Sequence, residues 1–200
     1  MKLLFNEQVI EFEKIPLVEE VLEKINDLLQ NDFYFSHFIV DGKEVLEAPG
    51  EFLKMNLRAI ESLEIISVSA KEFINNLLLS AEEYTKRAVP HITTLADEFY
   101  NNPSSSSWAE LNELFEGIQW LSTMIETVDQ SVVRPSNWMD VLTPTLAMQA
   151  ELGNFEEALD NTDTVLIADM LHFEILTVFE ALSAEMKIAI DTEGTRHDLN

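Results

Sequence analysis

The amino-acid sequence predicts an α+β protein in which a small strand-rich unit is followed by an α-helical bundle. Turn signals separate short alternating or β-branched segments in the first seventy or so residues. From about Lys71 onward, apolar residues recur instead with the spacing of helices. We therefore expect a sheet unit over residues 1–70, a bundle of four to five helices over residues 71–190, and a polar, frayed tail over residues 191–200.

The first seventy residues carry signals for a hairpin, a helix and further strands, in that order. The segments MKLLF and VIEFE flank a polar turn and predict the hairpin. Pro16 opens an amphipathic helix over LVEEVLEKINDLL, and the aromatic, β-branched run FYFSHFIV predicts the next strand. Asp41-Gly42 supplies a turn that tolerates positive φ, and LEIISV predicts the last strand after a short strand and an irregular link.

This order of elements resembles that of the ubiquitin-like β-grasp family. A set of short motifs with nearly the same spacing is similar to the second half of ubiquitin: Gly42-Lys43, Asn56-Leu57 and Glu61-Ser62-Leu63-Glu64-Ile65. The resemblance covers about the first third of the chain and needs one extra residue between Gly42 and Asn56. It implies a β-grasp fold for residues 1–70, on a scaffold that many unrelated functions share.

The resemblance also implies which side chains are buried and which bind a partner. It implies four inward-facing residues: Phe38, Val40, Leu63 and Ile65. It further implies that Ile39 and Ile66 form an exposed apolar binding patch, with His37 and Glu64 beside them. No diglycine tail follows the last strand, so conjugation to other proteins is not expected. The acidic residue beside Ile66 argues against the partners that bind ubiquitin itself.

Proline, glycine and capping signals divide the rest of the chain into helices. We expect a long helix interrupted or kinked at Pro90, and a second helix that begins at the capping box Ser107-Trp108-Ala109-Glu110. A third helix from Asn137 contains Pro144 and is expected to break at Gly153-Asn154. The final segment TVLIADMLHFEILTVFEALSAEMKIAI is apolar on more than one face and is expected to be central.

The charge is strongly one-sided, with 12 basic against 37 acidic residues and a net charge of −25. Nucleic acid and anionic membrane are therefore not expected as partners, because a phosphate backbone needs a basic surface. A basic protein partner fits this charge, and so does a purely solubilising role. No cysteine is present, and neither a signal peptide nor an apolar run of membrane-spanning length is evident, so we expect a cytoplasmic protein.

Two local patterns in the helical region suggest sites, but ordinary packing explains both. Asp169, His172 and Glu174 are weak candidates for metal ligands, since a carboxylate and a histidine three residues apart share a helical face. Carboxylate-bridged sites need a second such pair, so we expect a hydrogen-bonded histidine, no metal and no cofactor. The segment AELGNFEEALDNTDTVL resembles the turn of one tetratricopeptide repeat, and a single copy predicts a helical hairpin rather than an array.

No motif of a nucleophile elbow, a phosphate-binding loop or a dinucleotide-binding turn occurs, and we assign no catalytic residue. The sequence favours a non-enzymatic interaction or adaptor protein that binds through His37, Ile39, Glu64 and Ile66. The same patch is equally compatible with docking on the protein's own helical bundle. The alternatives are a metal- or small-molecule-binding helical protein, and a homodimer joined through the last helix.

Overall fold

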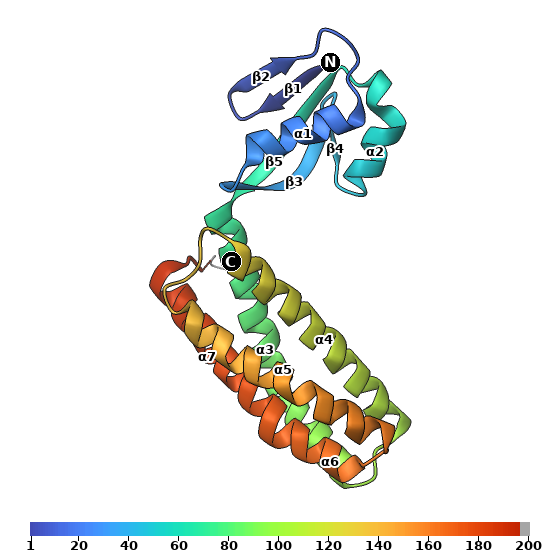
Figure 1. Cartoon of the computed structure of the whole chain (residues 1–200), viewed down its shortest axis with the longest axis vertical. Coiled ribbons are helices and arrows are strands. Elements are labelled where there is room, and N and C mark those ends of the chain that lie inside the picture. Colours follow the sequence, from blue (N-terminus) through green and yellow to red (C-terminus); the bar gives the residue numbers. More distant parts are fainter. Residues whose placement is uncertain (197–200) are drawn as a thin grey trace. The chain divides into compact units, whose positions relative to one another are not determined.

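The computed structural model describes residues 1–196, apart from the side chain of Leu152. The chain divides into two compact units, Met1–Phe73 and Ile74–Asn200, and each is described by itself. The first unit, here the sheet unit, is built on a mixed sheet; the second, here the helical unit, is a bundle of helices (Figure 1). The predicted α+β class, with a sheet followed by helices, is confirmed.

The sheet unit contains five strands, two α-helices and one 3₁₀ turn. In chain order they are β1 (Lys2–Phe5), β2 (Gln8–Glu11), α1 (Val18–Leu29), β3 (Phe33–Val40), β4 (Lys43–Val45), α2 (Pro49–Asn56), η1 (Leu57–Ala59) and β5 (Ser62–Ser69). The sheet order is β2-β1-β5-β3-β4. Strands β1 and β5 are parallel and the other neighbours are antiparallel, an arrangement consistent with a β-grasp-like unit.

One face of this sheet forms the core of the unit together with α1 and α2. The alternate residues Leu3 and Phe5 of β1 are buried, and α1 contributes Val21, Ile25 and Leu29 at helical spacing. The four residues predicted to face inward all belong to this core: Phe38, Val40, Leu63 and Ile65. Apolar burial on this one face is the main source of the unit's stability.

Strand β3 contains a bulge that the alternation of its sequence does not reveal. Phe35 pairs with Ser67 and His37 pairs with Ile66, so Ser36 is an extra residue on β3. The bulge reverses the alternation, so Phe35 and Phe38 both pack toward the core, with ring centroids 4.6 Å apart. After the bulge, His37 and Ile39 point away from the core.

The link between β4 and β5 is more ordered than expected, since α2 and η1 occupy most of it. Pro49 stands in the first turn of α2, where its fixed φ suits a helix and its missing N–H costs nothing. Leu53 and Leu57 are buried in the core of the unit, which fixes both short elements. The predicted turn at Asp41-Gly42 is confirmed, with φ of 48° and 81° at the two residues.

Up to residue 196, where the described part of the chain ends, the helical unit is made of four long helical segments. They are α3 (Ala70–Tyr100), α4 (Ser105–Gln130), α5 (Trp138–Asp160), and a run made of α6 (Thr164–Asp169), the π-helical turn η2 (Met170–Ile175) and α7 (Leu176–Glu193). Tyr84 of α3 contacts Trp120 of α4 and Phe179 of α7, and Phe115 of α4 contacts Phe155 of α5. Within the described residues, no helix combines the length and apolarity needed to cross a membrane.

The expected helix break at Gly153-Asn154 was wrong, and the helices of this unit also run through both of their prolines, because tertiary packing overrides these local signals. Helix α3 continues through Pro90, with Ile92 and Leu95 buried just beyond it. Helix α5 continues through Pro144 and Gly153, so the expected hairpin at Gly153 is absent. Met148 and Phe155 are buried seven residues apart on one face of α5, and this stripe runs past the glycine. The turn comes instead after Asp160.

Helix α4 begins earlier than expected, and the chain after α7 is held in place. Ser104 is the N-cap of α4 and exchanges hydrogen bonds with Ser107, so Glu110 has no capping role. Thr195 exchanges two hydrogen bonds with the Asn75 side chain, of 2.8 and 2.9 Å. The expected frayed tail is therefore wrong for residues 191–196, and residues 197–200 lie outside the described residues.

Candidate functional site

The strand register assembles the four residues predicted to bind a partner on one face of the sheet. His37 of β3 lies opposite Ile66 of β5, and Ile39 lies opposite Glu64. Directly opposed residues have Cβ atoms about 4.5–5.5 Å apart, so the four side chains form one contiguous group. All four are half-buried, and Ile39 and Ile66 lie outside the hydrophobic core. We call the face that carries them the outer face.

Further apolar residues extend this group across the sheet. Leu4 of β1 pairs with both Val9 of β2 and Glu64 of β5 and therefore shares the outer face. Val9 is 56% exposed and Leu4 is half-buried. The alternation in MKLLF and QVIE could have revealed both, because Leu3 and Ile10 are the partners that turn inward.

Tyr34 and Val68 continue the outer face on the far side of the bulge. They pair with one another across β3 and β5, and Val68 is two residues beyond Ile66 on the same strand. The Tyr34 ring stacks on Phe73 with centroids 4.1 Å apart and an angle of 18° between planes. Simple alternation would have placed Tyr34 on the core face with Phe38, so only the bulge brings it here.

The charges on the outer face are mainly negative. Glu44 of β4 pairs with Ile39, and Glu64 lies between Leu4 and Ile39 in the register. Neither carboxylate forms an ion pair or a hydrogen bond within the described residues. Lys2 is the basic residue of this face, and its ammonium lies 3.0 Å from the Glu11 carboxylate. Apolar side chains beside unneutralised carboxylates favour a partner that offers both an apolar group and a positive charge.

The three weak metal candidates of the helical unit are not brought together. Asp169 accepts a hydrogen bond from the Tyr100 hydroxyl, which raises the pKa of that tyrosine because the neutral phenol is the donor. His172 lies within η2, and its Nδ1 is buried with no hydrogen-bond partner in the described part of the chain. Glu174 is exposed to solvent.

The π-helical turn η2 explains why these residues do not share a helical face as their spacing suggested. Its hydrogen bonds span five residues instead of four, so residues three apart no longer align as in an α-helix. Among residues 1–196, no three histidine, aspartate or glutamate side chains converge in a way that could hold a metal ion. The hydrogen-bonded partner of Asp169 is a tyrosine, and His172, which was expected to be hydrogen-bonded, has no partner at Nδ1 among the described residues.

Comparison with known proteins identifies a family for the helical unit. A family model described as Domain of unknown function (DUF8042) matches residues 76–185, which is more than half of the 200 residues, so the chain belongs to this family. The matched segment lies wholly within the helical unit, and the strands of the sheet unit lie before it. No curated protein and no solved structure matches the chain.

Proposed function

We propose that this member of the DUF8042 family is a non-enzymatic interaction or adaptor protein, and that the outer face of its sheet binds a protein partner. The partner segment carries an apolar side chain flanked by lysine or arginine. The observation that carries the proposal is the apolar group Leu4, Val9, Ile39 and Ile66 on the face opposite the core. An apolar patch in a polar surround is a common mark of an interaction site.

The apolar area sets the strength of the expected contact. A patch of this kind offers at most a few hundred Å², and ~25 cal/mol per Å² gives several kcal/mol before the costs of association. The expected affinity is therefore weak to moderate, in the range of transient signalling contacts rather than of permanent complexes.

Charge selects the chemistry of the partner. Residues 1–73 carry 15 acidic and 7 basic side chains, a net charge of −8, and Glu44 and Glu64 lie beside the apolar group with no ion-pair partner among residues 1–196. Lysine or arginine at the edge of the partner segment would approach these carboxylates, which speeds association and makes binding sensitive to salt. Nucleic acid would be repelled by the same charges.

The resemblance to ubiquitin-like domains supports the choice of this face. In support of this choice, the strand register has Ile39 and Ile66 as diagonal neighbours on β3 and β5, on the face that lies away from the core. The second possible occupant is the protein's own helical unit. Trypsin cleavage at Lys71, next to the end of β5, separates these cases, because a docked sheet unit is protected and a free one is released quickly.

Selection of peptides from a random library on the full-length protein tests the proposal. We expect enriched peptides in which leucine, isoleucine or phenylalanine is flanked by lysine or arginine, with dissociation constants that rise with salt. The double substitution Ile39→Asp/Ile66→Asp should weaken their binding at least tenfold, since it places two charges in the apolar group. Met55→Asp is the matched control, because Met55 is 77% exposed on α2 and lies outside the outer face.

Two results would overturn this proposal. One is an enriched set without basic residues; the other is a set whose binding is the same for the wild type and the double variant. Circular dichroism and thermal unfolding of each variant come first, so that loss of binding is not confused with loss of the fold.

A further inference from the structure

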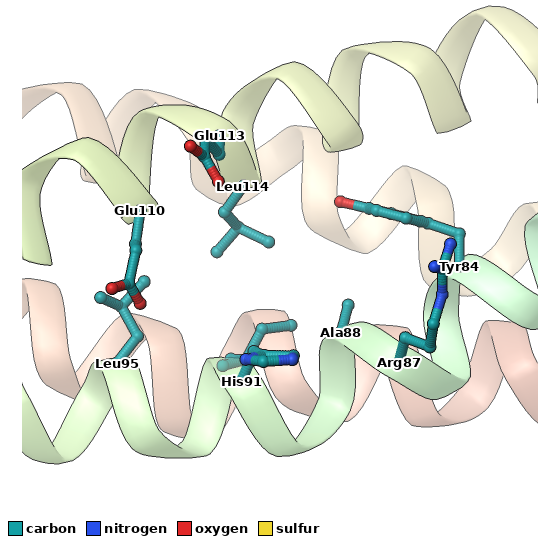
Figure 2. Close-up of a pocket in the computed structure, with 9 residues that line it drawn as sticks. Tyr84, Arg87, Ala88, His91, Leu95, Glu110, Glu113 and Leu114 are labelled. Atoms are coloured by element: carbon teal, nitrogen blue, oxygen red, sulfur yellow. The ribbon is translucent and has the colours of Figure 1, made fainter. Parts of the chain in front are cut away.

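A pocket of about 670 Å³ lies between α3 and α4 of the helical unit, where no sequence motif pointed. This volume falls within the range of small-molecule sites, about 300–1,000 Å³. The lining residues all lie within the segment matched by the family model. They are Tyr84, Arg87, Ala88, His91, Ile92, Leu95, Glu110, Glu113 and Leu114 (Figure 2).

The floor of the pocket is apolar. Ile92 and Leu95 of α3 and Leu114 of α4 are buried, and Ala88 leaves room above the helix because its side chain is a single methyl group. A floor of this kind removes apolar surface of a ligand from water, which supplies binding energy without fixing its orientation.

An aromatic ring closes one end of the pocket. Tyr84 points from α3 toward α4 (Figure 2), where a Cβ atom at Gly117 would lie 1.6 Å from its hydroxyl oxygen. The ring packs edge-on against Trp120 at 5.7 Å. The Tyr84 ring can therefore lie here only because residue 117 has no side chain. The ring forms an apolar, electron-rich wall against which a ligand in the pocket can pack.

Two carboxylates line the wall formed by α4. Glu110 and Glu113 lie three residues apart on this helix, and Figure 2 shows Glu110 reaching toward Leu95, away from the tyrosine. Neither glutamate forms an ion pair or a hydrogen bond with any residue in the described part of the chain. His91 lies on the α3 side of the pocket and is also without a partner there. Polar groups at one end of an apolar pocket give a ligand its orientation.

The charge of the unit favours a cation at this place. Residues 74–200 carry 22 acidic and 5 basic side chains, a net charge of −17. Each of the five cations already has a carboxylate within 4 Å, and this includes Arg87 at the rim, which lies 3.8 Å from Glu83. An anionic ligand would meet a strong opposing field, whereas a cation would be attracted.

We propose that the pocket between α3 and α4 binds a small organic amine with an apolar body. Its ammonium group lies between Glu110 and Glu113, and its body covers Ala88, Leu95 and Leu114 and ends against the Tyr84 ring. This site is separate from the outer face of the sheet, so the two proposals stand or fall independently.

Titration of the full-length protein with three ligands of similar shape tests this site. The probes are 2-phenylethylamine, its neutral analogue 2-phenylethanol and the anion 3-phenylpropionate. Their binding is measured by calorimetry and by tryptophan fluorescence. We expect saturable binding of the amine, binding at least tenfold weaker for the alcohol, and none for the anion. Equal affinity for all three ligands, or no saturable binding of the amine, would overturn the proposal.

Matched charge variants locate the site. Glu110→Gln/Glu113→Gln should weaken amine binding at least tenfold. Glu116→Gln/Glu126→Gln removes the same amount of charge from exposed positions of α4 outside the pocket. This control pair should change the affinity for the amine less than twofold. Equal weakening by both pairs would show nonspecific attraction and would contradict the proposal. Ala88→Phe, which fills the pocket without changing charge, should abolish binding in a protein whose unfolding is still cooperative.

Discussion

The two units of this protein differ in how their surfaces are built, and the difference separates two kinds of recognition. The sheet unit packs one face of its sheet with α1 and α2 and leaves Leu4, Ile39 and Ile66 on a broad outer face. The helical unit instead buries its apolar side chains between helices and leaves a pocket beside Tyr84. An open sheet face suits a macromolecular partner, whereas a pocket suits a small molecule.

The units also differ in what determines their local structure. In the sheet unit, strand period and turn residues decide which side chains are buried. In the helical unit, contacts between helices override Pro90 and Gly153. Substitutions at neighbouring or chemically equal positions should therefore have very different effects, depending on the unit and on the face.

The largest expected difference is between two adjacent residues of β3. Phe38→Ala should lower the free energy of unfolding of the sheet unit by about 3–5 kcal/mol, because Phe38 is 3% exposed and its removal leaves a cavity. Ile39→Ala, on the outer face, should cost about 1 kcal/mol or less. Urea unfolding followed by circular dichroism measures both. Similar losses for the two variants would mean that the outer face is covered.

Two helical glycines give the next comparison, within the helical unit. Gly117→Ala should destabilise by about 1–3 kcal/mol, because the new Cβ would overlap the Tyr84 hydroxyl, 1.6 Å away. Gly153→Ala meets no atom within 4 Å and should stabilise α5 by about 0.5–1 kcal/mol. Thermal unfolding of both variants tests this sign difference. A stabilising Gly117→Ala would contradict the close approach of Tyr84 to α4.

The smallest expected effects concern ion pairs, one in each unit. Arg196 donates hydrogen bonds of 2.7 and 3.2 Å to Glu82, whose side chain is 4% exposed, so Arg196→Gln should lower the free energy of unfolding by removing a partner of a buried carboxylate. Lys2 and Glu11 of the sheet unit are more than half exposed, and Lys2→Gln should cost about 0.5 kcal/mol or less. Equal losses for the two variants would contradict the burial of Glu82.

The Arg196 contribution also has a defined pH dependence. The hydrogen bond from Arg196 lowers the pKa of the Glu82 carboxyl from its ordinary value of 4.5. A carboxyl group whose pKa is lowered in the folded state stabilises the fold fully at pH values above its ordinary pKa. This stabilisation is lost as the pH falls through the lowered, folded-state pKa. The difference between the wild type and Arg196→Gln should therefore be full at pH 7 and shrink below about pH 4.5. Urea unfolding across this range measures it, and a difference independent of pH would rule out the ionised pair.

The sequence was sufficient where the signal is local and periodic. The strand FYFSHFIV and the Asp41-Gly42 turn follow from β propensity and turn chemistry, and the resemblance to ubiquitin-like domains implied the burial of Phe38 and Leu63; the structure bears these expectations out. The place of Tyr34 on the outer face could not be inferred, because a bulge reverses the alternation and leaves no mark in composition.

The pocket of the helical unit could not be inferred either. Its walls come from α3 and α4, whose residues Tyr84 and Glu113 are far apart in the chain, and only the packing of the helices joins them. The sequence predicted that Glu110 belongs to a capping box. Because α4 begins earlier, at Ser105, Glu110 does not cap the helix, and its side chain lines the pocket. Gly117, which gives Tyr84 its place, carries no sequence signal beyond being a glycine within a helix.

The central claim is that the outer face of the sheet binds a basic, partly apolar protein segment. The most direct test is a titration of the isotope-labelled full-length protein with a selected peptide, in which the changes in amide chemical shift are measured by NMR spectroscopy. The account predicts that the shifts cluster on β1, β3 and β5, around Leu4, Ile39 and Ile66, and that they vanish in the Ile39→Asp/Ile66→Asp variant. Shifts confined to residues 74–196 would contradict it and would move the interaction to the acidic helices.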